Sequence, residues 1–163
     1  MSRLLEGDVG SGKTAVAATT AYAVATSHRF ISKTKKHEIM PDSFANLQVA
    51  YMAPTEILAR QHFLSIEKYL KNSQVRRGLL IGGMPAVKRG ALLHQIASGD
   101  MDIVVGTVAL VQQDVDFDNL GLVIIDEQHK FGVHQRAMLR KGKSPHCLVM
   151  TATPIPRTLT MTA

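Results

Sequence analysis

Short apolar runs alternate with stretches of helical periodicity along this chain. Six runs have the apolar, β-branched character of buried strands, and they cover residues 3–6, 48–52, 76–80, 103–106, 120–126 and 147–151. Four stretches place apolar residues at helical spacing, and they cover 13–26, 56–71, 87–97 and 135–140. This alternation predicts one α/β domain over residues 1–163, with a doubly wound, mainly parallel sheet and helices on both faces.

The stretch 27–46 departs from this alternation. It carries the basic run Lys33-Thr34-Lys35-Lys36 and the turn-forming Pro41-Asp42-Ser43 without a sustained period, so we interpret it as a surface insertion. Part of the formal net charge of +6 lies here, which favours a polyanionic partner. The same residues fit a solvated loop as well as a basic contact with nucleic acid.

The composition is that of an ordinary globular protein. The chain has 163 residues, of which 45% are hydrophobic and 20% charged, so it can bury a core and is neither fibrous nor disordered. Its longest weakly polar stretch, 15–25, is about half a membrane span, and its amino end lacks the regions of a signal peptide. We therefore expect a cytoplasmic protein without membrane contact. The single cysteine, Cys147, permits no internal disulfide and fits a small core residue.

One run between the first predicted strand and the first predicted helix matches G-x-x-x-x-G-K-[ST] at every fixed position. The run consists of Gly7, Asp8, Val9, Gly10, Ser11, Gly12, Lys13 and Thr14. Its glycines let successive amides turn around phosphate oxygens, and the following helix presents its positive end. Lys13 would reach the outer phosphates, while the Thr14 hydroxyl would ligate Mg²⁺. The run predicts a nucleoside-triphosphate site rather than a plain glycine turn.

Two adjacent carboxylates follow the apolar run 120–125. Asp126 would hold Mg²⁺ through its water shell, and Glu127 would orient and deprotonate the water that attacks the γ-phosphate. An acidic pair alone is also a common start to a loop. Combined with the phosphate loop, it predicts a hydrolase.

Several strings resemble the motifs of superfamily 2 nucleic-acid helicases and translocases. Motif I is 7–14, motif Ia is 53–59, and motif Ib surrounds Gly106-Thr107. Asp126-Glu127-Gln128-His129 is similar to motif II, and Thr151-Ala152-Thr153-Pro154 is similar to motif III. The longer strings 4–14, 126–133 and 151–159 resemble the RecG family, bacterial ATP-dependent DNA helicases that regress forks and migrate branched DNA.

The resemblance implies a RecA-like P-loop NTPase domain that uses ATP and Mg²⁺, with Lys13, Asp126, Glu127 and His129 in catalysis. It also implies a nucleotide contact by Gln128, and coupling of nucleotide state to DNA movement through Gln128, His129, Thr151 and Thr153. A groove for the phosphates of one DNA strand is implied at Thr55, Gly82, Gly83 and Thr107. The glycine pair also fits a turn, and either threonine fits a helix N-cap.

The transcription-repair coupling factor is the nearest alternative family. It shares the phosphate-loop string and the Pro156-Arg157-Thr158 segment but usually carries Asp-Glu-Glu-His in motif II, so Gln128 and the string 132–136 favour RecG. Three positions depart from the usual RecG pattern: Val108 replaces a His, Lys130 replaces an Arg, and Glu6 replaces a Gln. The Val108 difference concerns the contact made by motif Ib, and none of the three removes a residue of the hydrolysis chemistry.

Helicases of this class place ATP between two RecA-like domains, and the second supplies an arginine finger worth about 10³–10⁵ in rate. We expect this chain to be the first such domain of a monomeric helicase, with the wedge domain and second RecA-like domain as partners in the same polypeptide and branched DNA as substrate. Alone it would hydrolyse ATP very slowly. A second hypothesis is a fragment that binds nucleotide or DNA without catalysis.

Overall fold

The computed structural model describes residues 2–8, 10–31, 43–126 and 145–152. Its strands are β1 (Ser2–Glu6), β2 (His28–Ile31), β3 (Ser43–Asn46), β4 (Gln48–Met52), β5 (Arg77–Leu80), β6 (Ile103–Gly106), β7 (Leu120–Asp126) and β8 (His146–Thr151). Its helices are α1 (Lys13–Ala25), α2 (Glu56–Tyr69), α3 (Ala86–Ala97) and the short 3₁₀ helix η1 (Val108–Val111). The helix predicted at 135–140 lies outside the described residues.

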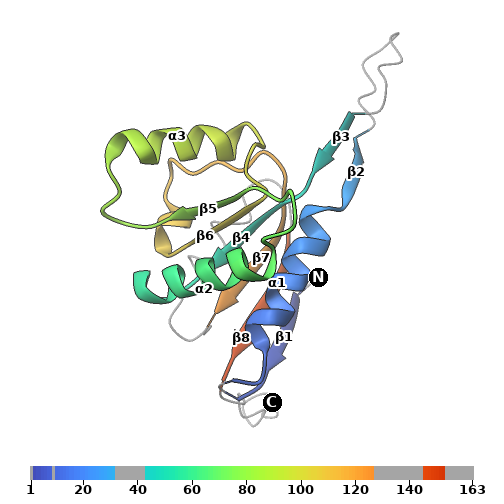
Figure 1. Ribbon diagram of the computed structural model, residues 1–163. Coiled ribbons are helices and arrows are strands. Elements are labelled where there is room, and N and C mark those ends of the chain that lie inside the picture. The colour runs from blue at the N-terminus through green and yellow to red at the C-terminus, as the bar shows by residue number, and fades with distance from the viewer. Residues whose placement is uncertain (1, 9, 32–42, 127–144, 153–163) are drawn as a thin grey trace, which may run out of the picture.

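The six predicted strands form one sheet in the order β1-β8-β7-β4-β6-β5 (Figure 1). Every neighbouring pair in it is parallel. Because all strands run the same way, their carboxyl ends meet at one edge, where ligands bind in sheets of this kind. The predicted fold class is confirmed.

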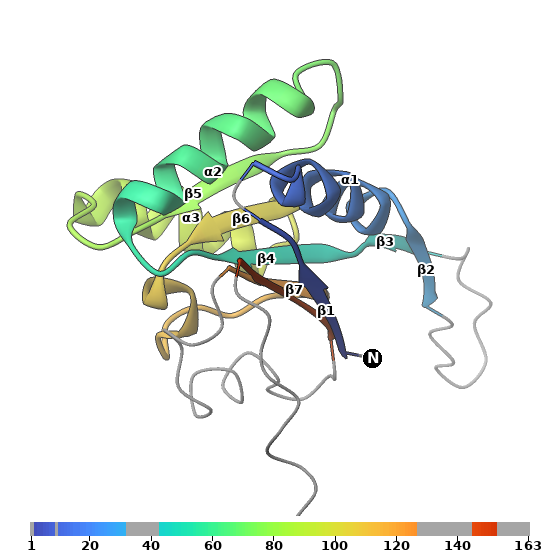
Figure 2. The same cartoon turned by 90° about the horizontal axis from the view of Figure 1, so that it is seen from below.

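Helices cover both faces of the sheet. Small residues of α1 and the apolar side of α2 pack on the face that carries Val49, Tyr51 and Ile124. The opposite face carries Met52, Val104 and Ile125, and α3 and η1 pack there. Figure 2 shows α1 and α2 lying along the same side of β4. Alternate side chains of each central strand thus enter opposite cores, which explains why these strands are apolar throughout.

The stretch 27–46 contains a structure that the sequence pattern did not predict. β2 and β3 pair antiparallel, from His28 opposite Asn46 to Ile31 opposite Ser43, and the pair projects from the sheet beyond α1 (Figure 1). The strands are short and lack an alternating apolar face, so periodicity could not reveal them. The two segments are thus paired strands within the stretch predicted as a surface insertion, and the insertion itself stays a prediction.

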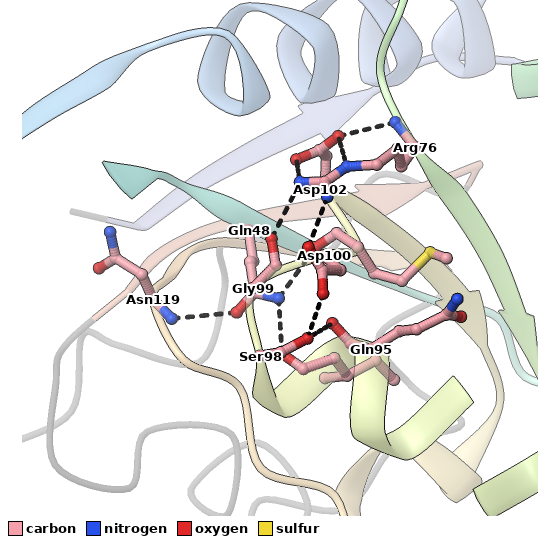
Figure 3. A network of polar contacts seen from close by, with 10 residues as sticks. Gln48, Arg76, Gln95, Ser98, Gly99, Asp100, Asp102 and Asn119 are labelled. Carbon is pink, nitrogen blue, oxygen red and sulfur yellow. Dashed lines mark hydrogen bonds and ion pairs between the residues drawn. The ribbon is translucent and has the colours of Figure 1, made fainter. Parts of the chain in front are cut away.

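A network of polar contacts lies at the amino ends of β4, β5 and β6 (Figure 3). The buried Asp102 carboxylate accepts hydrogen bonds from the backbone N–H of Arg76 at 2.7 Å and from its guanidinium at 3.0 and 3.2 Å. Asp102 in turn raises the pKa of Arg76. β5 begins at Arg77, one residue later than the apolar pattern predicts.

Gln48, a buried residue beside this network, makes side-chain hydrogen bonds to three backbone groups. Its amide Nε2 donates to the carbonyls of Ile96 and Met101, both at 2.9 Å, and its Oε1 accepts from the backbone N–H of Asn119 at 3.0 Å. The side chain is only 1% exposed. One residue at the start of β4 thereby joins the end of α3, the turn before β6 and the turn before β7.

Replacing Gln48 with Leu should lower the free energy of unfolding by about 3 kcal/mol, because three hydrogen bonds to buried backbone groups are lost and leucine replaces none of them. Urea unfolding followed by circular dichroism measures the change. The same substitution at Gln61, an exposed residue of α2, is the control and should change stability by less than about 0.5 kcal/mol. Equal stability of the two variants would contradict the structural role of Gln48.

Candidate functional site

The carboxyl edge of the sheet gathers most of the predicted motifs. In spatial order it carries the phosphate loop after β1, Thr151 at the end of β8, and Asp126 at the end of β7. Across β4, β6 and β5 it then carries Thr55, Thr107 and the pair Gly82-Gly83. One half of the edge therefore holds the predicted nucleotide residues and the other half holds the predicted nucleic-acid residues. β7 and β4, which are paired, form the boundary between the halves.

The first residue of the phosphate loop, Gly7, is hydrogen-bonded to β8, the strand that lies beside β1 in the sheet. The backbone N–H of Gly7 donates to the carbonyl of Thr151 at 3.3 Å, continuing the register that pairs Glu6 with Thr151. Thr151 is buried, at 2% exposure. The structure thus brings the start of the predicted motif I against the first residue of the predicted motif III.

Two glycines of the phosphate loop are in the left-handed conformation. Gly10 and Gly12 have φ of 82° and 87°, left-handed values that strain any residue with a side chain, and a Cβ at either position would meet no atom within 4 Å. Gly12 is also the N-cap of α1, whose first turn contains no acidic residue. The amino end of α1 therefore carries no competing acidic side chain in its first turn, which fits binding of an anion there.

Lys13 folds over this loop. Its Nζ donates to the carbonyls of Gly7 and Asp8, the latter at 2.7 Å. The ammonium is thus held at the mouth of the loop by backbone oxygens. Thr14 follows in the first turn of α1 and is half-buried.

Asp126 has a partner that the motif did not predict. Its Oδ2 lies 2.7 Å from Nε2 of His62 on α2, and Nδ1 of His62 lies 3.2 Å from the hydroxyl of Tyr51 on β4. The His62 and Asp126 side chains are 13% and 15% exposed, while Tyr51 is fully buried. Burial and the negative charge of Asp126 raise the pKa of Tyr51 above its usual range, so this phenol stays protonated.

The four predicted nucleic-acid residues differ in their exposure to solvent. Thr55 is exposed and caps α2, since its hydroxyl accepts from the N–H of Leu58 at 3.3 Å, as the N-cap interpretation predicts. Gly82 and Gly83 are exposed, and Gly83 has φ of 67°. Thr107 precedes η1 without a side-chain cap and is only 7% exposed. Thr55 and the glycine pair are therefore the accessible members of this predicted groove.

A comparison with protein-family models decides the family. The model described as DEAD/DEAH box helicase matches residues 2–162, nearly the whole chain. The chain belongs to the DEAD/DEAH box helicase family. The RecG resemblance seen in its motifs is also confirmed, because curated helicases of that name match nearly the whole chain. The ATP-dependent DNA helicase RecG of Streptococcus pneumoniae is 48% identical over 164 residues, and that of Bacillus subtilis is 48% identical over 163.

Each of these comparisons covers nearly all of this chain but only part of the relative. The matched region is 22% of the Streptococcus pneumoniae protein and 21% of the Bacillus subtilis protein. The chain therefore spans about a fifth of the length of the curated relatives it matches.

Solved helicase structures agree with the fold. A structure of RecG bound to a three-way DNA junction superposes with a TM-score of 0.74 at 40% identity, covering 95% of this chain and 18% of that one. Domain 2 of a DEAD-box helicase bound to an RNA duplex gives a TM-score of 0.65 at 15% identity, covering 93% of this chain and 54% of that one, and shows the fold alone. Among the described residues of this helicase chain, no helix is long and apolar enough to cross a membrane.

Several predicted site residues of the helicase domain lie outside the described residues, namely Val9, Glu127, Gln128, His129 and Thr153. Sequence analysis in turn missed His62 and Tyr51. The position of each residue on its helix or strand could have indicated a buried polar contact. His62 occupies the same face of α2 as the buried Ala59 and Ile66, and Tyr51 is an aromatic residue with a hydroxyl inside a fully buried strand. A polar group on an apolar face needs a buried partner, and here that partner is Asp126.

Proposed function

We propose that this chain is the nucleotide-binding, first RecA-like domain of a DNA helicase that couples ATP hydrolysis to the movement of branched DNA. The observation that carries the proposal is the arrangement of the carboxyl edge, where phosphate loop, Thr151 and Asp126 adjoin Thr55 across the paired strands β7 and β4. The similarity to RecG proteins supports it. The second RecA-like domain, the wedge domain, a monomeric state and a bacterial cytoplasmic location belong to the same proposal.

The residues of the phosphate loop would bind the nucleotide. Backbone amides from Gly10 to Thr14 and the amino end of α1 would surround the phosphates, and Lys13 would contact the outer ones. Thr14 and Asp126 would hold Mg²⁺, which neutralises charge on the phosphates when bound. Glu127 would orient the attacking water and take its proton. His129 and Thr153 would take part in coupling, together with Gln128 and Thr151.

The other half of the edge would bind one DNA strand through its phosphates. Thr55 presents a hydroxyl at the amino end of α2, and the exposed pair Gly82-Gly83 presents backbone amides before α3. Contacts of this kind carry no sequence information, so binding should follow DNA shape and weaken steeply with salt. Thr107, being buried, would contribute through its backbone.

Two substitutions at Thr55 test the DNA half without removing the cap of α2. Aspartate and asparagine both cap helices well, so Thr55→Asp and Thr55→Asn should retain the stability of the parent chain. A carboxylate facing a phosphate is repelled, so Thr55→Asp should bind forked DNA roughly tenfold more weakly than Thr55→Asn. Fluorescence anisotropy with a labelled three-way junction at low salt measures both affinities. Equal affinities of the two variants would exclude a phosphate contact at the amino end of α2.

A further inference from the structure

The contact between His62 and Asp126 joins a predicted magnesium-binding carboxylate to a helix on the nucleic-acid half of the edge. It is short, at 2.7 Å between Nε2 and Oδ2, and both side chains are largely buried. His62 packs on the ring of Tyr51 with centroids 4.9 Å apart. The imidazole is thus held by a tilted ring contact with Tyr51 and by a polar contact at each of its two nitrogens.

The directions of these hydrogen bonds follow from the groups involved. An ionised carboxylate only accepts, so Nε2 of His62 must carry the proton that it donates to Asp126. In the neutral imidazole Nδ1 is then an acceptor, and the protonated phenol of Tyr51 donates to it. In the imidazolium both nitrogens donate and the Tyr51 oxygen accepts. Nε2 is therefore the donor in the contact with Asp126.

The His62 donor contacts one of the two carboxylate oxygens of Asp126, Oδ2. Within the residues that the structure describes, Oδ1 of Asp126 receives no hydrogen bond, while Oδ2 is held by His62. A carboxylate held at one oxygen cannot rotate freely, so its other oxygen keeps a fixed direction. Partners of this kind orient metal-binding side chains in many proteins, and their loss typically lowers metal affinity about 10–100-fold.

We propose that His62 is the positioning residue that fixes Asp126 for magnesium-nucleotide binding, with Tyr51 holding the imidazole in place. The inference rests on the proposed function, because it assigns Asp126 to Mg²⁺. It adds a residue from α2 to the nucleotide site. Since Thr55 begins the same helix about two turns earlier, one rigid element joins the proposed DNA contact to the positioned acid.

The test compares ATP binding with Mg²⁺ and with EDTA, by calorimetric titration into the parent chain and three variants. His62→Leu removes the donor, and it should weaken binding of ATP with Mg²⁺ about tenfold while leaving binding in EDTA unchanged. His62→Gln places an amide N–H near the position of Nε2, so it should restore most of the Mg²⁺-dependent affinity. Tyr51→Phe keeps the buried ring and removes only the hydroxyl, so it should fold like the parent and show a smaller loss of the same kind.

The outcomes separate this inference from the proposed function. A loss of affinity that is equal in Mg²⁺ and in EDTA would show a merely structural role and overturn the inference, as would failure of His62→Gln to restore binding. An unchanged ratio of the two affinities in His62→Leu would also overturn it while leaving the nucleotide site intact. If the parent chain bound ATP in neither condition, the proposed function itself would fail, and the inference with it.

Discussion

Gly106→Ala is expected to lower the free energy of unfolding by about 4 kcal/mol, enough to unfold much of a marginally stable domain. A Cβ at Gly106 would lie 2.2 Å from the carbonyl oxygen of Leu80 and 2.9 Å from Cγ of Leu110. The first of these atoms belongs to the backbone of β5, which is paired with Gly106 in the sheet. Relief of the clash would therefore require displacement of a whole strand next to the predicted motif Ib.

Gly90→Ala provides the matched control for this prediction. Gly90 lies within α3, and a Cβ there would meet no atom within 4 Å. Because alanine favours the helix more than glycine does, this variant should be more stable than the parent chain by about 0.5–1 kcal/mol. Urea unfolding followed by circular dichroism measures both. A Gly106→Ala variant within about 1 kcal/mol of the parent would contradict the close approach of β5 and β6.

Asp126→Asn is expected to remove the Mg²⁺ dependence of ATP binding. Asparagine has nearly the same shape and can still accept a hydrogen bond from His62, but it carries no charge for the cation. A charge-assisted contact is worth about 1.5–3 kcal/mol, so affinity in Mg²⁺ should fall roughly 10- to 100-fold, toward the value measured in EDTA. Calorimetric titration in both conditions measures the two affinities.

Asp116→Asn makes the same change of charge at an exposed position in the segment before β7. It should bind ATP as the parent chain does, in Mg²⁺ and in EDTA alike. A parallel decrease in the two variants would indicate that overall charge, rather than a carboxylate at the end of β7, accounts for the effect. Retention of full Mg²⁺ dependence in Asp126→Asn would exclude Asp126 as a magnesium-binding residue.

The central sheet was predictable because a strand that is buried on both faces is apolar along its whole length. β4, β6 and most of β7 are buried, and each appears in the sequence as a continuous apolar run between helical patterns. The β2–β3 pair could not be predicted in this way. Its pairing is antiparallel and local, and its sequences show no alternation of apolar and polar residues. η1 is a single short turn, below the length at which periodicity can be detected.

The places of candidate site residues in the fold were predictable where a motif prescribes both residue type and position. The left-handed glycines of the phosphate loop and the place of Asp126 at the end of β7 are of this kind. The contact of His62 with Asp126 was not, because it joins residues far apart in sequence through the packing of α2 on the sheet. Tertiary structure decides which histidine of a chain faces a carboxylate.

The most direct test of the central claim is calorimetric titration of ATP with Mg²⁺ into this chain and into Lys13→Ala. The account predicts saturable binding with one site in the parent chain and a loss of at least about tenfold in the variant, because the ammonium at the mouth of the phosphate loop is removed. Circular dichroism should show that both proteins are equally folded. Equal binding by the two proteins, or no binding by the parent chain, would contradict the claim that this loop is a nucleotide site.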